Sequence, residues 1–238
     1  MKKLNVVITA GGTSEPIDKV RKITNSGTGR LGKIIAEKLL ENENINIYYI
    51  CSKKALRPSN ERVSIIEIET VNELKKEVET LLTNTKIDYF IHSMAVSDYY
   101  VDYVTTSNIL ANELNISPNL EETIINPQNK LDNTSKISSN EENLIVMLKK
   151  APKVIELIKK LSPETKLIGF KLLENVTKEE LLKVAINLKD KNNCDYVVAN
   201  DLKNITKDTH EAFIIDKNNN YKQVFTKLEI AQKIKELK

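Results

Sequence analysis

The stretch LNVVITAGG, residues 4–12, points most directly to a fold. Residues 4–9 are mostly β-branched, which is typical of a buried strand, and the small residues Ala10, Gly11 and Gly12 indicate a turn directly after it. In an open α/β sheet the ligand crevice lies at the carboxyl ends of the strands. We therefore expect Gly11 and Gly12 to lie at the ligand-binding edge of a sheet.

Strand-like and helical segments alternate along the rest of the chain. Apolar residues recur at helical spacing over 71–82, and this segment opens with Thr70 and Glu73, the two residues of a capping box. This alternation predicts an α/β fold, a Rossmann-like and mainly parallel sheet with helices on both faces. A hairpin over 213–225 and a helix over 227–237 close the chain. The other expected strands are 45–51, 63–67, 89–92, 144–148, 166–171 and 196–199, and the other helices 31–40, 152–160 and 178–193.

The segment from Val96 to Ser139 differs in composition from its surroundings. It is rich in Asn, Ser and Thr and lacks a clear period, and a structureless stretch of this length is unusual inside a compact domain. We expect a single domain over 1–238 in which about 99–135 form an insertion, as a lid or an interface arm. Because one subunit would have difficulty burying its scattered apolar residues, we expect them at a homodimer interface: Ile109, Leu110, Leu114, Ile116, Leu120, Ile124 and Ile125.

The composition argues against several classes of protein. Lys and Arg number 36 and Asp and Glu 33, so the formal charge is only +3, and the chain has no Trp and 5% aromatic residues. Without a strong basic field or stacking aromatics, no nucleic-acid partner is expected. Two cysteines form neither a disulfide framework nor a zinc site, and we name no metal-ligating residue. No apolar run approaches a membrane span, so we expect a soluble cytoplasmic protein.

Five of the six glycines lie at positions 11, 12, 27, 29 and 32. Residues 27–32, GTGRLG, match the dinucleotide fingerprint G-x-G-x-x-G, but that motif follows the first strand directly. Here residues 10–26 intervene, and the second strand ends in Cys51-Ser52-Lys53-Lys54 without an acid to bind a ribose. A phosphate cradle at the start of the 31–40 helix fits this spacing better. A standard NAD fold, and glycines that serve only tight packing, are the alternatives.

Residues 8–39, ITAGGTSEPIDKVRKITNSGTGRLGKIIAEKL, resemble the opening signature of the phosphopantothenate–cysteine ligase family. The chain starts at this signature, so it resembles the standalone bacterial form rather than the form fused behind a flavin-dependent decarboxylase. Shorter similarities follow in the family's order and extend over nearly the whole chain: 95–98 (AVSD), 136–139 (KISS), 148–155, 169–173 (GFKLL) and 195–201 (DYVVAND).

This resemblance implies a two-step reaction in coenzyme A biosynthesis. The carboxylate of 4′-phosphopantothenate attacks the α-phosphate of CTP and releases pyrophosphate. The amine of L-cysteine then attacks the acyl-cytidylate and releases CMP. CTP would be the co-substrate, together with Mg²⁺. Both steps develop charge on oxygen atoms, so fixed donors and cations are required. No residue is a clear reader of the cytosine edge, so ATP remains an alternative.

The resemblance also implies roles for individual residues. Asn25 would be catalytic, holding the acyl group of the substrate and favouring the second step, and Arg21 would bind the phosphorylated substrate. Lys136, the second catalytic candidate, would neutralise the triphosphate. Asp98 would contact the nucleotide, with Phe170 beside its base. Ala95 is expected at the substrate, and the remaining expected nucleotide-binding residues are Gly11, Gly12, Gly27, Gly29, Pro152, Lys153, Val154, Ile155 and Lys189.

Departures from the family pattern leave some points open. The fused form has two lysines in the helix before the last parallel strand. Here those positions are Leu188 and Asn192. Lys189 is one residue from the first of them and Lys191 one residue from the second. The two histidines, at 92 and 210, match no family residue, and we expect them to be structural or solvent-facing. Two other functions remain open from the sequence: an NAD(P)-dependent oxidoreductase and a nucleotide-binding module without catalytic activity.

Overall fold

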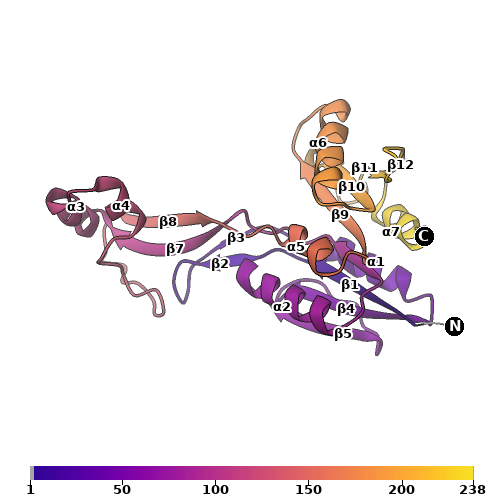
Figure 1. The fold of residues 1–238 in the computed structure, drawn as a ribbon, viewed down its shortest axis with the longest axis horizontal. Helices are drawn as coiled ribbons and strands as arrows, with labels where there is room; N and C mark the ends of the chain where they lie inside the picture. The colour runs from indigo at the N-terminus through magenta and orange to yellow at the C-terminus, as the bar shows by residue number, and fades with distance from the viewer. Residues whose placement is uncertain (1–2, 238) are drawn as a thin grey trace.

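The computed structural model describes residues 3–237, and its main sheet has the strand order β12-β11-β10-β9-β6-β1-β4-β5 (Figure 1). Neighbouring strands from β5 to β10 pair in parallel, whereas β11 pairs antiparallel with β10 and β12. The predicted Rossmann-like, mainly parallel sheet and the C-terminal hairpin are confirmed. The strands are β1 (Leu4–Ala10), β4 (Ile45–Ser52), β5 (Val63–Ile68), β6 (Tyr89–His92), β9 (Lys166–Leu173), β10 (Tyr196–Asp201), β11 (Ala212–Ile215) and β12 (Tyr221–Val224).

Helices cover both faces of this sheet. Successive residues of a strand point to opposite faces, so a single strand packs against both layers of helices. Ile8 of β1 is buried in the cluster that contains α1 and α7, and the adjacent Val7 in the cluster that contains α2, α5 and α6. Within residues 3–237, no helix combines the length and the apolar composition that a membrane crossing requires. The helices are α1 (Arg30–Leu39), α2 (Val71–Asn84), α5 (Val154–Leu161), α6 (Lys178–Lys191) and α7 (Lys227–Glu236).

Helix starts follow local signals in the sequence. The predicted capping box of α2 is present, with the Glu73 N–H donating to the Thr70 hydroxyl at 3.2 Å. The helix predicted from Pro152 begins two residues later, at Val154, because the backbone of Lys153 is extended and serves as the N-cap. Lys153 and the first turn of α5 therefore lie at the carboxyl edge of the sheet, while Val154 is buried.

The order of the parallel strands reverses at β1, because β4 and β5 follow on one side of it and β6 and β9 on the other. At such a switch point the loops after neighbouring strands diverge and leave a crevice. Backbone hydrogen bonds join the two loops at its base: the Ala95 N–H donates to the Gly11 carbonyl at 2.9 Å, and the Thr13 N–H to the Ala95 carbonyl at 3.1 Å. Gly11 and Gly12 lie at the edge of the sheet where the sequence predicts them.

An arm of two antiparallel strands and two helices projects from the sheet (Figure 1). β7 (Tyr99–Thr106) pairs with β8 (Leu144–Lys150), and α3 (Ser107–Ile116) and α4 (Leu120–Ile125) lie at the far end. The insertion thus has regular structure and extends beyond residue 135, since the strand predicted at 144–148 is the return strand of the arm. Its helices show little periodicity in the sequence because Leu110 is the one buried residue that they contain.

A short hairpin that the sequence does not predict lies between β1 and α1. It consists of β2 (Ser14–Pro16) and β3 (Lys22–Thr24), and β2 contacts β7 at the base of the arm. Each strand has only three residues, which is too short for a period-2 signal. This hairpin occupies much of the interval that separates the first strand from the glycine-rich segment.

The buried carboxylate of Asp195, directly before β10, joins three neighbouring elements of the fold. Asp195, whose side chain is 6% exposed, accepts from the Leu167 N–H at 2.9 Å and pairs with Lys159 at 2.8 Å and Lys217 at 2.7 Å. Burial alone raises the pKa of this carboxyl, but the hydrogen bonds from both lysines and from Leu167 bring the pKa below its ordinary value. Three elements, α5, β9 and the β11–β12 turn, are held by one side chain.

We predict that Asp195→Asn lowers the free energy of unfolding at pH 7 by about 3 kcal/mol, because it leaves the half-buried Lys159 ammonium without its counter-charge. The pKa of Asp195 is lower in the folded protein, so its contribution is complete above the unfolded pKa of about 3.9 and disappears as the pH falls below it. Urea denaturation should show a difference in the free energy of unfolding between parent and variant at pH 7, and this difference should disappear in acid. The matched control is Glu79→Gln, in an exposed pair with Lys75, which should cost under about 0.5 kcal/mol. Equal midpoints at pH 7 would contradict this account.

Candidate functional site

A cavity of about 670 Å³ lies at the carboxyl ends of β1 and β6 and extends along β9 and β10. Its size is typical of pockets that hold a small ligand. Segments far apart in the sequence form its walls: the loop 26–29 with the first turn of α1, residues 92–98 after β6, the start of α5, the end of α6, and residues 200–210 with Lys227.

The floor of this cavity is a crossing of two backbone segments. A Cβ on Gly12 would lie 1.9 Å from the carbonyl oxygen of Asn25, and a Cβ on Gly27 would lie 2.4 Å from that of Gly11. Any side chain at Gly12 or Gly27 would force the segments apart. Their contact places the start of α1 at the cavity, where the N-cap residue Gly29 has no side chain and the Arg30 N–H donates to the Thr28 hydroxyl at 3.3 Å. The positive end of the helix dipole favours an anion here.

Eight of the predicted site residues line this cavity, and their segments meet although they span much of the sequence. Asp98 and Lys153 form an ion pair across the two ends of the arm, and the Ala151 N–H donates to the Asp98 carbonyl at 2.8 Å. Phe170 of β9 is half-buried in the wall. The eight residues are Gly11, Gly27, Gly29, Ala95, Asp98, Lys153, Ile155 and Phe170.

Other predicted residues lie outside the cavity lining. Gly12 lies beneath the loop, Pro152 precedes the cavity-lining Lys153, and Val154 points into the core. Asn25 is half-buried directly before the cavity-lining Ser26. Its N–H donates to the Thr13 carbonyl at 3.0 Å, while its side-chain amide forms no hydrogen bond to residues 3–237.

Lys189 lies away from this cavity. Its side chain is buried, pairs with Asp190 at 2.7 Å, donates to the Lys217 carbonyl at 3.2 Å and lines a separate cavity beside Cys194. The lysine of α6 that lines the main cavity is Lys191, which pairs with Glu156 at 2.8 Å. Of the two lysines, Lys191 therefore lines this cavity and Lys189 does not, because two residues along a helix rotate a side chain by about 200°.

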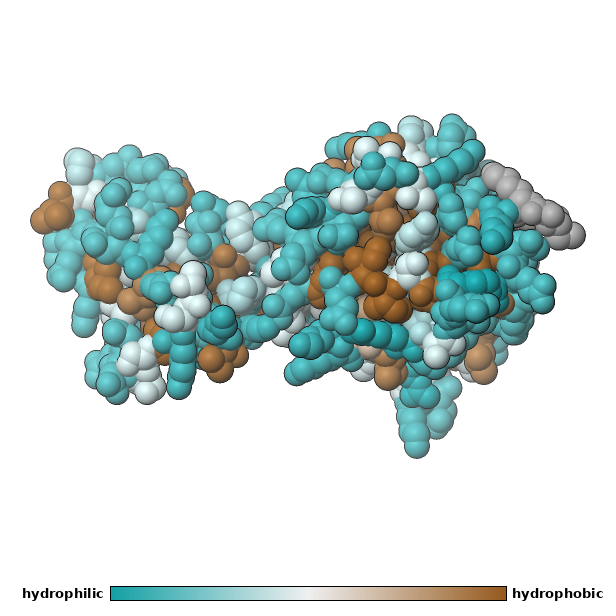
Figure 2. Space-filling model, turned by 90° about the horizontal axis from the view of Figure 1, so that it is seen from below, coloured by the Kyte–Doolittle hydropathy of each residue, from teal (hydrophilic) through white to brown (hydrophobic). Residues whose placement is uncertain are grey.

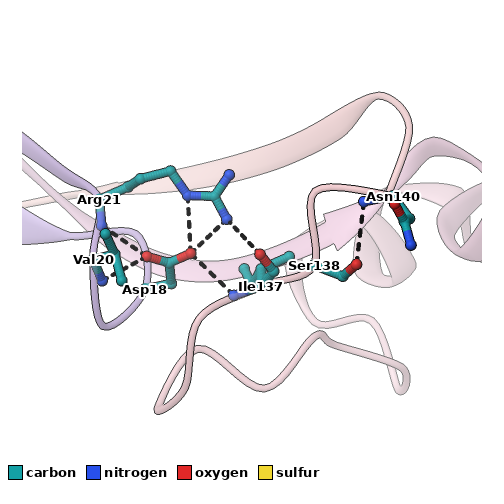
Figure 3. A network of polar contacts seen from close by, with 6 residues as sticks. All are labelled: Asp18, Val20, Arg21, Ile137, Ser138 and Asn140. Carbon is teal, nitrogen blue, oxygen red and sulfur yellow. Dashed lines mark hydrogen bonds and ion pairs between the residues drawn. The ribbon is translucent and has the colours of Figure 1, made fainter.

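Arg21 and Lys136 lie together at the base of the arm, outside the cavity lining. The buried Asp18 carboxylate accepts from the Val20 N–H at 2.8 Å, the Arg21 N–H at 2.7 Å and the Ile137 N–H at 3.1 Å, and it pairs with the Arg21 guanidinium (Figure 3). Arg21 also donates to the Ile137 carbonyl at 3.1 Å. These contacts hold the pKa of Asp18 far below its ordinary range, with the Arg21 hydrogen bond as the largest cause. Lys136 is exposed beside this cluster.

Both histidines, which we expected to be structural or solvent-facing, line the cavity together with Asn192. His92 bonds to the Thr9 hydroxyl through Nδ1 at 2.9 Å, and burial lowers its pKa to about 4, so it is neutral at pH 7. Both ring nitrogens of His210 and the Oδ1 atom of Asn192 are buried without a hydrogen-bond partner among the described residues. The sequence could have indicated His92 as a cavity residue, since it ends a predicted strand at the carboxyl edge of the sheet. His210 follows an irregular loop, and no local pattern indicates its position.

The cavity carries a positive formal charge. Five basic side chains and two carboxylates line it, which gives +3 with both histidines neutral. Both carboxylates, Asp98 and Glu156, are already paired with lysines. The cations that remain without an ion pair in the described part of the chain are Arg30, Lys171 and Lys227. The site is therefore suited to an anionic ligand.

Sequence comparison places relatives over the whole chain. Residues 1–125 and 126–237 match the family described as the DNA/pantothenate metabolism flavoprotein C-terminal domain. The coenzyme A biosynthesis bifunctional protein CoaBC of Thermococcus kodakarensis is 31% identical over 230 residues, which are 96% of this chain and 49% of that protein. Its counterpart in Methanocaldococcus jannaschii is 30% identical over 233 residues, with 97% and 49% covered. The chain spans about half the length of these curated relatives.

Solved structures share the architecture. The DNA/pantothenate metabolism flavoprotein from Streptococcus pneumoniae is 40% identical, with a TM-score of 0.84 over 98% of this chain and 97% of that chain. A Cab2 mutant in complex with phosphopantothenate-cysteine has a TM-score of 0.70 at 18% identity, over 97% of this chain and 85% of that chain. At 18% identity, the likeness to the Cab2 mutant shows a shared fold alone.

The Asp18 cluster predicts how the base of the arm responds to a single substitution. In Asp18→Asn the side chain keeps one acceptor oxygen and turns an NH₂ group toward the N–H donors of Arg21 and Ile137. Residues 136–139 should then detach, and trypsin should cleave after Lys136 several-fold faster than in the parent. The exposed Asp208→Asn is the control and should leave cleavage unchanged. Cleavage of Asp18→Asn at the parent rate would show that the cluster does not hold the arm.

Proposed function

The chain belongs to the DNA/pantothenate metabolism flavoprotein C-terminal domain family, and we propose that it is a ligase that joins 4′-phosphopantothenate to L-cysteine, with CTP forming an acyl-cytidylate. The observation that carries this proposal is the meeting of the separate motif segments around one positively charged cavity. The names of the relatives support it, since they refer to coenzyme A biosynthesis and, for the Cab2 mutant, to a bound phosphopantothenate-cysteine.

The chemistry of the proposed reaction matches the cavity. In the first step a carboxylate oxygen attacks the α-phosphorus of CTP and pyrophosphate leaves. In the second step the cysteine nitrogen attacks the acyl carbon, loses a proton, and CMP leaves. Both 4′-phosphopantothenate and CTP are anionic, and each step moves charge onto phosphate oxygens, so cations without an ion pair and the positive end of the α1 dipole would stabilise both steps. The half-buried Phe170 offers a surface for the base.

We propose that Mg²⁺ is carried by the phosphates of CTP, where it would offset their charge. The residues that the structure describes contain no cluster of three or more His, Cys, Asp or Glu side chains placed for a metal. The cavity carboxylates Asp98 and Glu156 are paired with Lys153 and Lys191. A cation that keeps several waters and binds mainly to phosphate fits this donor set.

We further propose that the arm pairs two copies of the chain. Exposed apolar side chains gather on it (Figure 2), with Ile116 86% exposed and Leu120 58% exposed. Chain entropy opposes the ordering of α3 and α4, which bury only Leu110, and a second arm would supply further contacts. Such pairing would bring the base of one arm, with Arg21 and Lys136, to the cavity of the partner subunit, where Lys136 would neutralise the triphosphate. This arrangement accounts for two expected site residues that lie outside their own cavity.

The activity is tested by pyrophosphate release from CTP. Release should require 4′-phosphopantothenate and not cysteine, and product should form when cysteine is added. Tight NADPH binding without pyrophosphate release would favour an oxidoreductase. Binding of CTP without turnover would favour a nucleotide-binding module. Replacement of CTP by ATP in the same assay tests the choice of nucleotide.

Asn25→Asp should separate the two steps of this reaction. The substitution keeps the shape of the side chain but replaces its donors with a charge, which opposes a second, anionic transition state. We expect pyrophosphate release to persist while product formation falls by about 10²–10³-fold, so that acyl-cytidylate accumulates in a quenched reaction. Asn84→Asp, at an exposed helix end, is the control. Normal product formation by folded Asn25→Asp would end the catalytic assignment.

The arm proposal predicts a dimer whose arm is essential. Ile116→Asp combined with Leu120→Asp should give a monomer by sedimentation and abolish most activity, because two charges enter an apolar interface. Leu228→Asp, on a residue of α7 that is 66% exposed, should leave the dimer intact. Proteolysis of the parent arm should slow when CTP and Mg²⁺ are added. A parent protein that sediments as a monomer, with unchanged cleavage, would remove this proposal.

A further inference from the structure

His210 presents two buried polar atoms that the protein itself leaves unbonded. The side chain lies in the cavity wall, the residue is 6% exposed, and neither Nδ1 nor Nε2 has a hydrogen-bond partner in residues 3–237. Its backbone is fixed by a hydrogen bond from its N–H to the Phe225 carbonyl at 2.7 Å and by a bridge to Ile205. A buried polar group without a partner costs stability, and a bound ligand would supply the partner.

Two cations without counter-ions line the same cavity. Lys227 is the first residue of α7 and Arg30 the first residue of α1, and neither forms an ion pair with a described residue. Helices α1 and α7 pack side by side, and Lys235 pairs with Glu41 at 2.6 Å beyond the carboxyl end of α1. The helices therefore run in the same direction, with both amino ends at the cavity. Two positive dipole ends add to the two side-chain charges.

These groups influence one another's protonation. Burial lowers the pKa of His210 to about 4, with a smaller contribution from Lys227, so the imidazole is neutral at pH 7 and keeps one N–H donor. Burial also lowers the pKa of Lys227, and repulsion from Arg30 adds to this effect. The carboxylates in the cavity wall are Asp98 and Glu156, and each is paired with a different lysine. Like charges held together without a carboxylate are stabilised by an anion.

We propose that His210, Lys227 and Arg30 form a phosphate-binding subsite, in which His210 donates a hydrogen bond and the two cations neutralise charge. The ligand group is a phosphate or pyrophosphate. Only the identity of the ligand rests on the proposed function. Under that function the phosphate group comes either from the triphosphate of CTP or from the phosphate of 4′-phosphopantothenate. The C-terminal segment, beyond the parallel strands, then takes part directly in ligand binding.

Calorimetric titration of the whole chain tests this subsite with four probes: inorganic pyrophosphate, CTP, CMP and 4′-phosphopantothenate. Lys227→Gln and His210→Ala should each weaken binding about tenfold or more, because each removes a partner of a charged group. Loss confined to CTP and pyrophosphate identifies the nucleotide phosphates as the source. Loss confined to 4′-phosphopantothenate identifies the other source. His210→Gln, which keeps an N–H donor, should recover part of the affinity, and the exposed Lys222→Gln should bind as the parent does.

A purely structural role of His210 would give a different result. His210→Ala would then lower the melting temperature of the ligand-free protein while its affinity for every probe stayed at the parent value, and that outcome overturns the proposal. The test is also separable from the ligase assignment. If the parent binds CTP without releasing pyrophosphate and the variants bind it more weakly, the subsite stands and the ligase does not. If the parent turns over and the variants bind all probes normally, the subsite fails alone.

Discussion

The contact between the backbone at 11–12 and the backbone at 25–27 is the constraint on which this site depends. Two glycines allow it, because a Cβ would lie 1.9 Å from a carbonyl oxygen at Gly12 and 2.4 Å from one at Gly27, far inside van der Waals contact. The contact places the start of α1, with the positive end of its dipole, at the carboxyl edge of β1. A ligand can approach the main chain closely because no side chain intervenes.

The positive charge of the cavity arises because its carboxylates are paired with lysines while other basic side chains are not. The two carboxylates in the wall pair with lysines: Asp98 with Lys153 at the ends of the arm, and Glu156 of α5 with Lys191 of α6. Three basic side chains of the described wall remain without an ion pair: Arg30, Lys171 and Lys227. The arm divides its groups in a similar way. Its base is tied by the buried Asp18, and its tip exposes apolar side chains such as Ile116. One end of the arm is rigidly placed and the other is available for contact.

Sequence periodicity predicted the sheet, both helical layers and the C-terminal hairpin, because strands and helices that each bury one face carry that requirement in their residues. It did not predict β2 and β3, which are too short to show a period, or α3 and α4, which bury almost nothing. Similarity to a family indicated the segments that meet at the cavity. It did not resolve the lysine of α6, since neighbouring residues on a helix face different directions and only packing shows that Lys191 lines the wall.

The sequence by itself determined the α/β class, the glycine-rich edge and the family, since each depends on residues close together in the chain or on an order of motifs. Only the tertiary structure decided which polar groups share one cavity. His210 and Arg30 are separated by most of the chain, and they line the same wall because α7 packs beside α1 and the loop before β11 returns to the sheet edge. The same holds for Arg21 and Ile137, whose contact with Asp18 depends on where the arm leaves the sheet. Contacts of this kind are set by the packing of whole elements, and no local pattern encodes them.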